Sequence, residues 1–110
     1  MNTIVEESKW EPFFRSYTQH YAGRRTRLAV FEVNDGTMND LWLENGLPLV
    51  EVALFSNKKE ASIGIILENC THMVAEPEVV SIVQNGPDTG LDILDTNGTT
   101  TVLRFDGSDS

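Results

Sequence analysis

A single cysteine, Cys70, occurs among the 110 residues of the chain. One thiol cannot form an intrachain disulfide, and it cannot build a zinc site of the kind that uses several cysteines. The sequence therefore excludes two common ways of stabilising a small domain.

Basic residues are also scarce. The chain has 8 lysines and arginines against 17 aspartates and glutamates, and its formal net charge is -9. Proteins that bind the phosphate backbone of nucleic acids, or the surface of anionic membranes, rely on lysine and arginine. The charge balance therefore argues against both kinds of partner.

Long apolar runs are missing as well. No stretch approaches the roughly 20 apolar residues that a membrane helix needs. The first ten residues lack a basic segment followed by an apolar run, so no secretory signal is expected and a cytoplasmic location follows as the default. The length and the hydrophobic content of 40% indicate one folded domain. We expect a loose arm over residues 1–7, one domain over residues 8–105, and a disordered tail over residues 106–110.

The segment 47–67 organises the rest of the chain. Two runs rich in aliphatic residues flank the polar turn Ser-Asn-Lys-Lys, which predicts a β-hairpin with Val52 opposite Ile63. In that register one face is entirely apolar: Val50, Val52, Leu54, Ala61, Ile63, Ile65 and Leu67. The other face is mixed: Leu49, Glu51, Ala53, Phe55, Glu60, Ser62, Gly64 and Ile66. We expect the mixed face to be an outer surface half covered by other parts of the fold, and a partner surface is the alternative.

A helix is predicted near the N-terminus. Ser8 and Glu11 fit a capping box, although Pro12 also suits a helix that begins one turn later. Gly23 is a natural stop. Aromatic residues recur at helical spacing and predict the core face of this helix: Trp10, Phe13, Phe14, Tyr17 and Tyr21.

Strands are predicted on both sides of the central hairpin. Residues 24–33 read as the first strand and residues 79–83 as a later one, whereas residues 37–46 are expected to form helical turns or a packed loop. The last unit is predicted to be a hairpin with the three-residue loop 96–98. That loop places Leu91 opposite Leu103 and holds Gly98 in the left-handed region.

Together these elements predict an α+β domain. The apolar stripe of the helix must be buried, and the apolar face of the hairpin is the natural surface to receive it. We expect the helix to pack on a strongly bent antiparallel sheet, or a small barrel of the Sm or SH3 type, with five to six strands.

The order of these motifs resembles a small bacterial family known only as a domain of unknown function. The resemblance is carried by these residues: Trp10, Phe13, Phe14, Gly23, Leu47, Pro48, Leu49, His72, Pro77, Gly98, Leu103, Arg104 and Phe105. It covers nearly the whole chain except the segment between Asn34 and Gly46. The resemblance implies a single compact bacterial domain, and it supplies no catalytic residue and no substrate.

Glu68, Cys70 and His72 form the best local set of chemically active side chains. In an extended segment, alternate residues share one face, which would place a carboxylate, a thiol and an imidazole in a row. Such a row could bind a ligand or a metal such as zinc, or pair a thiolate with a base. The alternative is a buried Cys70 and a structural His72, and it is the interpretation that we favour.

Four of the eight basic residues lie within a short stretch: Arg15, Arg24, Arg25 and Arg27. They could form a site for an anion or for an acidic segment of a partner. The alternative, which we favour, is that they offset part of the acidic surface.

Motifs of the common enzyme classes are absent from the sequence, including the P-loop, the dinucleotide fingerprint, the nucleophile elbow and the paired-histidine motif. We therefore expect no catalytic set and no cofactor. The first hypothesis is a non-enzymatic interaction or accessory module that binds a protein partner or itself, for example as a homodimer. The second is a protein that binds a small ligand or metal, conceivably an enzyme, centred on His72. The third is a nucleic-acid-binding small barrel.

Overall fold

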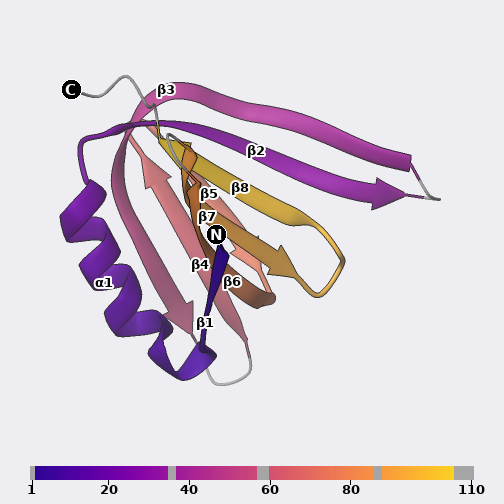
Figure 1. The fold of residues 1–110 in the computed structure, drawn as a ribbon, viewed down its shortest axis with the longest axis horizontal. Helices are drawn as coiled ribbons and strands as arrows, with labels where there is room; N and C mark the ends of the chain where they lie inside the picture. Colours follow the sequence, from indigo (N-terminus) through magenta and orange to yellow (C-terminus); the bar gives the residue numbers. More distant parts are fainter. Residues whose placement is uncertain (1, 35–36, 57–59, 86–87, 106–110) are drawn as a thin grey trace.

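The computed structural model describes residues 2–34, 37–56, 60–85 and 88–105, so the tail expected over residues 106–110 lies outside the described chain. The described chain forms one α-helix, one short 3-10 helix and eight strands (Figure 1). Their bounds are β1 Asn2–Val5, η1 Glu7–Lys9, α1 Trp10–Tyr21, β2 Arg25–Asn34, β3 Thr37–Ser56, β4 Ala61–Leu67, β5 Cys70–Ala75, β6 Pro77–Asn85, β7 Asp88–Asp95 and β8 Thr100–Phe105.

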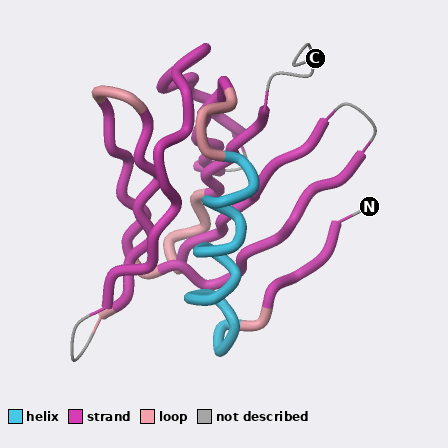
Figure 2. Tube along the Cα trace, turned by 90° about the vertical axis from the view of Figure 1, so that its left-hand side faces the viewer, coloured by secondary structure: helices cyan, strands magenta, loops and turns pink. Residues whose placement is uncertain are grey.

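All eight strands belong to one antiparallel sheet in the order β1-β6-β7-β8-β2-β3-β4-β5. We divide the sheet into a larger part, formed by β1, β6, β7, β8, β2 and the first half of β3, and a smaller part, and the long strand β3 belongs to both. Its first half pairs with β2 in the larger part, and its second half pairs with β4 in the smaller part, which consists of β3, β4 and β5 (Figures 1 and 2). Gly46 lies near the junction with φ of +99°, a conformation that favours glycine.

The predicted α+β class is confirmed, but the predicted number of strands is wrong. The sheet has eight strands rather than five to six, and it is not a closed barrel, because β1 and β5 stand at its two ends. Two segments account for the difference. Asn2–Val5, expected to be part of a loose arm, pairs with β6, and residues 37–46, expected to be helical turns or a loop, pair with β2.

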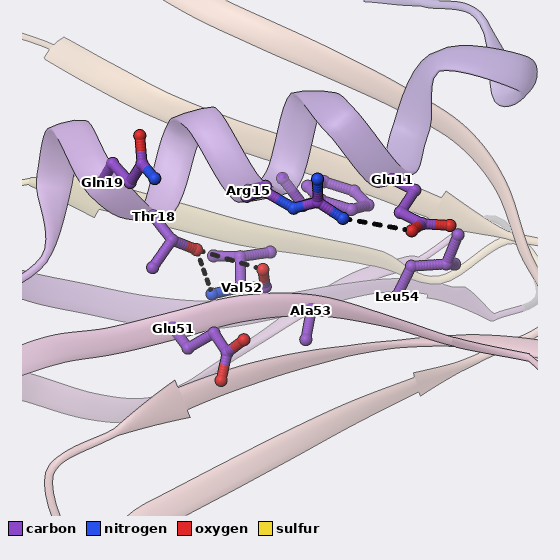
Figure 3. Close-up of a pocket in the computed structure, with 9 residues that line it drawn as sticks. Glu11, Arg15, Thr18, Gln19, Glu51, Val52, Ala53 and Leu54 are labelled. Carbon is purple, nitrogen blue, oxygen red and sulfur yellow. Dashed lines mark hydrogen bonds and ion pairs between the residues drawn. The ribbon is translucent and has the colours of Figure 1, made fainter.

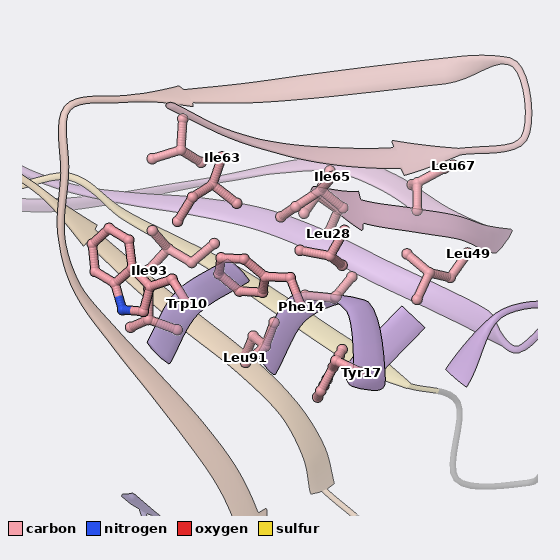
Figure 4. Close-up of a cluster of buried hydrophobic side chains, with 14 of the residues drawn as sticks. Trp10, Phe14, Tyr17, Leu28, Leu49, Ile63, Ile65, Leu67, Leu91 and Ile93 are labelled. Carbon is pink, nitrogen blue, oxygen red and sulfur yellow. The ribbon is translucent and has the colours of Figure 1, made fainter. Parts of the chain in front are cut away.

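The core lies between α1 and the inner surfaces of both parts of the sheet. Its aromatic residues Trp10, Phe14 and Tyr17 are buried there, as the aromatic spacing predicts (Figure 4). Phe13 and Tyr21 are partly buried and pack against this cluster. The strands supply the remaining large buried side chains: Leu28, Leu49, Val52, Ile63, Ile65, Leu67, Leu91, Ile93, Leu103 and Phe105. Burial of this apolar area is the main force that holds the helix on the sheet. No helix in the described part of the chain is long and apolar enough to span a membrane.

The start of α1 differs from the predicted capping box. Ser8 lies in η1, α1 begins at Trp10, and Lys9 at the N-cap makes no capping hydrogen bond through its side chain. Pro12 is then the third residue of the helix, where its missing N–H costs nothing, because the first four amides have no partner within a helix. Gly23 follows the helix with φ of +91°, as expected for a stop residue.

The central hairpin forms, but its register differs by two residues from the prediction. Val52 pairs with Ile65 rather than with Ile63, and Ser56 pairs with Ala61. A shift of two residues preserves the faces, since side chains alternate with a period of two. β3 has one extra residue, Val50, between Leu49 and Glu51. This bulge reverses the predicted faces of two residues, so that Leu49 is buried and Val50 is 50% exposed.

The C-terminal hairpin confirms the prediction. Leu91 pairs with Leu103, the loop is 96–98, and φ of Gly98 is +85°. The carboxylate of Asp95 fixes this loop by accepting hydrogen bonds from the amides of Asn97 and Thr99, at 2.9 and 3.0 Å.

Candidate functional site

An uncovered apolar surface lies on the outside of the smaller part of the sheet. We call it the outer face, and it consists of Val50, Ala53, Phe55, Gly64, Ile66 and Met73. Ala53, Gly64 and Met73 are direct neighbours across β3, β4 and β5. Phe55 and Met73 are each 46% exposed, which is unusual for side chains of this size in a small core-forming sheet.

Gly64 allows the two large side chains of the outer face to approach each other. A Cβ atom at this position would lie 2.7 Å from Cε2 of Phe55 and 3.1 Å from the sulfur of Met73. The aromatic ring and the thioether therefore fill the space above the glycine. The outer face therefore brings an aromatic ring and a thioether together at the centre of β4.

The structure places the helix and the larger part of the sheet on the opposite side of these strands (Figure 4). The mixed face was expected to be half covered by other parts of the fold. In the structure Ala53, Ser62 and Ile66 on this face are half-buried and Phe55 is exposed, and α1 packs on the inner face of the same strands.

The border of the outer face is acidic. Glu51 and Glu68 are exposed around it, whereas the carboxylate of Glu76 accepts a hydrogen bond from the hydroxyl of Thr96 in the β7–β8 loop at 3.4 Å. Residues 49–56, β4 and β5 contain no lysine or arginine, and Lys58 and Lys59 lie outside the described residues. The surface therefore combines an apolar centre with carboxylates at its edge.

Glu68, Cys70 and His72 do not form one row. Leu67 pairs with Cys70, so Glu68 and Asn69 make the turn between β4 and β5, and Asn69 adopts φ of +69°. Cys70 and His72 share the inner face of β5, whereas Glu68 is exposed in the turn. The described residues contain no group of three or more His, Cys, Asp or Glu side chains that could hold a metal ion.

His72 lines a groove of about 360 Å³ between β5 and the larger part of the sheet. We call it the seam groove. Its walls are Val30 and Glu32 of β2, residues 72–75 of β5, Asp95 and Thr99 of the last loop region, and Thr101 of β8. Burial lowers the pKa of His72 below its usual value, because the charged imidazolium is penalised away from water. The groove was not predicted from the sequence, since its walls come from strands far apart in the chain.

The four arginines are distributed over different surfaces. Arg15 pairs with Glu11 at 3.3 Å on the exposed side of α1, and the guanidinium of Arg24 lies 5.3 and 5.2 Å from the ring centroids of Tyr21 and Phe105. Arg25 and Arg27 are on β2, where Arg27 is paired with Arg104 of β8. Arg104 in turn lies 2.8 Å from the carboxylate of Asp92. Arg15 and Arg24 of the predicted arginine set therefore already interact with groups of the chain itself.

Two further grooves, each of about 460 Å³, flank the helix. The first lies between α1 and β3 (Figure 3), and its charged residues Glu11 and Arg15 already pair with each other. The hydroxyl of Thr18 closes part of this groove, because it donates to the carbonyl of Val52 at 3.1 Å and accepts from the Val52 amide at 3.0 Å. The second groove, between β1 and the start of α1, is lined mainly by apolar side chains.

Comparisons with known proteins bear on the fold. No protein-family model matches the chain, and no curated protein does. Among solved structures, the chain is similar to the one titled "Crystal Structure of Bacillus subtilis YojF protein", with a TM-score of 0.58 and 10% sequence identity. The match covers 96% of this chain and 94% of the other. At this identity the likeness shows a shared architecture over the whole domain and nothing about activity.

Proposed function

We propose that this chain is a non-enzymatic interaction module that binds a basic protein partner, in the cytoplasm, through the outer face of β3, β4 and β5. The observation that carries the proposal is the position of two exposed apolar side chains, Phe55 and Met73, above Gly64 on a face that no described helix covers. Contiguous exposed apolar patches on small proteins commonly mark interaction sites.

The charges around the outer face support the choice of partner. Glu51 and Glu68 border the patch, and the whole chain carries a formal net charge of -9. A partner with lysine or arginine around an apolar centre complements this surface, whereas a second copy of the chain would bring like charges together. Charged borders of this kind mainly set the rate and the specificity of association, while the apolar centre supplies most of the affinity.

The experiment is site-specific photo-crosslinking in the cells from which the gene comes. A photoreactive phenylalanine analogue replaces Phe55 in one variant, and it replaces Glu7, an exposed residue of the short helix η1, in the control. We expect a discrete protein adduct from position 55 that disappears when Met73→Lys is added, and none from position 7. Monomer alone at both positions, or the same adducts at both, would contradict the proposal.

The seam groove supports a second candidate function, which is binding of a small ligand beside His72. The groove has room for a small molecule, and polar groups of Glu32, His72 and Thr99 border it. Native mass spectrometry of gently purified protein tests it. A stoichiometric small adduct that is lost in His72→Phe would favour this function, and a bare chain mass in both proteins would count against it.

A further inference from the structure

The two ends of the sheet differ in how well they are protected. Natural edge strands carry charged side chains, prolines or bulges that discourage pairing with another chain, or they are very short. β1 has four residues, and the carbonyl of its last residue, Val5, accepts a hydrogen bond from the Trp10 indole at 3.0 Å. β5 has six residues, Cys-Thr-His-Met-Val-Ala, and none of them is charged or a proline.

The register fixes which main-chain groups of β5 point away from β4. The amide of Glu76 donates to the carbonyl of Ala61 at 3.2 Å. In an antiparallel pair, hydrogen-bonded positions alternate, so Cys70, His72 and Val74 exchange hydrogen bonds with β4. The amides and carbonyls of Thr71, Met73 and Ala75 then face the open edge. The described chain places no further strand beside them.

On these grounds, and resting on the proposed function, we infer that the partner binds as an extended strand along β5, with apolar side chains on the outer face and basic side chains in the seam groove. Strand addition of this kind obtains affinity from main-chain hydrogen bonds and specificity from alternate side chains.

The two sides of such a strand would meet different surroundings. On the outside, its side chains would lie beside Met73 and extend the apolar patch. On the inside, they would enter the seam groove, whose charged residues are Glu32 from β2 and Asp95 from β7. His72 contributes no opposing positive charge at neutral pH, since burial lowers its pKa. Because the side chains of a strand alternate between its two faces, the partner segment is expected to alternate apolar residues such as valine with basic residues such as lysine.

The test is a binding titration by fluorescence anisotropy with three labelled peptides, at low ionic strength. The first alternates lysine and valine, the second alternates glutamate and valine, and the third has the composition of the first with its valines grouped at one end. We expect the alternating basic peptide to bind at least about tenfold more tightly than either of the others. Equal binding of the acidic or the grouped peptide would overturn the inference.

Two variants test the edge itself. Met73→Pro removes the amide that faces the open edge, where proline is tolerated, and Met73→Leu keeps that amide and the apolar side chain. We expect Met73→Pro to weaken binding about tenfold or more and Met73→Leu to change it little. If Met73→Pro fails to fold, Glu32→Lys serves instead, with an expected loss of about threefold to tenfold and Glu32→Gln as the smaller, matched change.

Failure of this inference can be told apart from failure of the proposed function. If the yield of the crosslinked adduct at position 55 is unchanged by Met73→Pro, the proposed interaction function stands and binding by strand addition is overturned. A chain that dimerises by itself, with a dimer that Met73→Pro abolishes, would show that a second copy occupies the edge and would overturn the assignment of a basic partner.

Discussion

Both faces of β3, β4 and β5 carry large apolar side chains, but the rest of the fold covers the inner face and no described helix covers the outer one. On the inner face, Val52, Ile63 and Ile65 are at most 1% exposed, whereas Phe55 and Met73 on the outer face are each 46% exposed. Large apolar residues occur on both faces, so residue type alone does not account for this difference in exposure. The inner face packs against α1 and the larger part of the sheet, so its side chains form a core, whereas the outer face packs against neither.

The largest expected contrast between the faces is in stability. Phe14→Ala removes a ring that is 1% exposed from the inner core and is expected to lower the free energy of unfolding by about 3–5 kcal/mol. Phe55→Ala removes the same ring from the outer face and is expected to cost less than about 1 kcal/mol. Urea denaturation of both variants measures the contrast, and equal losses would mean that the outer face is part of the folding core.

The glycines of the two parts of the sheet give the next contrast. A Cβ atom at Gly90 would collide with the main-chain carbonyl of Leu103, while one at Gly64 would meet only the ends of two flexible side chains. We expect Gly90→Ala to lower the free energy of unfolding by about 3 kcal/mol or more, and Gly64→Ala to change it by less than about 1 kcal/mol. Thermal unfolding of both variants checks this order, which a greater loss from Gly64→Ala would reverse.

Loss of the hydrogen bonds that join Thr18 of α1 to Val52 of β3 is expected to have an intermediate effect on stability. Thr18→Val preserves the shape of the side chain but leaves the amide and the carbonyl of Val52 without their hydroxyl partner, at an expected cost of about 1–3 kcal/mol. Thr18→Ser retains the hydroxyl and is expected to recover most of that loss. Equal destabilisation by the two substitutions would show that the methyl group, and not the hydroxyl, matters.

The smallest effect is expected from His72, which lies between the two parts of the sheet. Burial lowers its pKa in the folded state, so as pH falls below the usual value of 6.5 the unfolded chain binds the proton first. The free energy of unfolding should therefore decrease between about pH 7.5 and pH 5.5, and the decrease should be smaller in His72→Gln. Denaturation curves at both pH values test this, and an identical pH dependence in the variant would exclude His72 as its source.

The two hairpins show what local sequence can and cannot specify. The β7–β8 hairpin follows the prediction because Gly98 must occupy a left-handed position and Asp95 fixes the loop, so turn chemistry and apolar pairing agree. In the β3–β4 hairpin, two registers that differ by two residues sort the side chains equally well. The extra residue at Val50 leaves no recognisable mark in the sequence, so the exchange of Leu49 and Val50 was not predicted.

Other differences also arise from contacts that are distant in sequence. Residues 2–5 are too few for their sequence pattern to predict a strand, and they form one by pairing with β6. Residues 37–46 mix apolar and polar side chains without alternation, yet β2 provides a partner along their whole length. The row of Glu68, Cys70 and His72 depended on extended structure at Glu68, which the two-residue turn at Glu68 and Asn69 replaces. Gly64 was visible in the sequence, but the packing of Phe55 and Met73 above it depends on the true register.

Hydrogen exchange at single amides of β5 tests the central claim most directly. In the free protein, the amides of Thr71, Met73 and Ala75 should exchange rapidly, while those of His72 and Val74 should be protected by β4. Addition of the alternating lysine–valine peptide should slow exchange at Thr71, Met73 and Ala75 and leave His72 and Val74 unchanged. Protection of all five amides in the free protein, or no change on addition of the peptide, would contradict an open edge that accepts a partner strand.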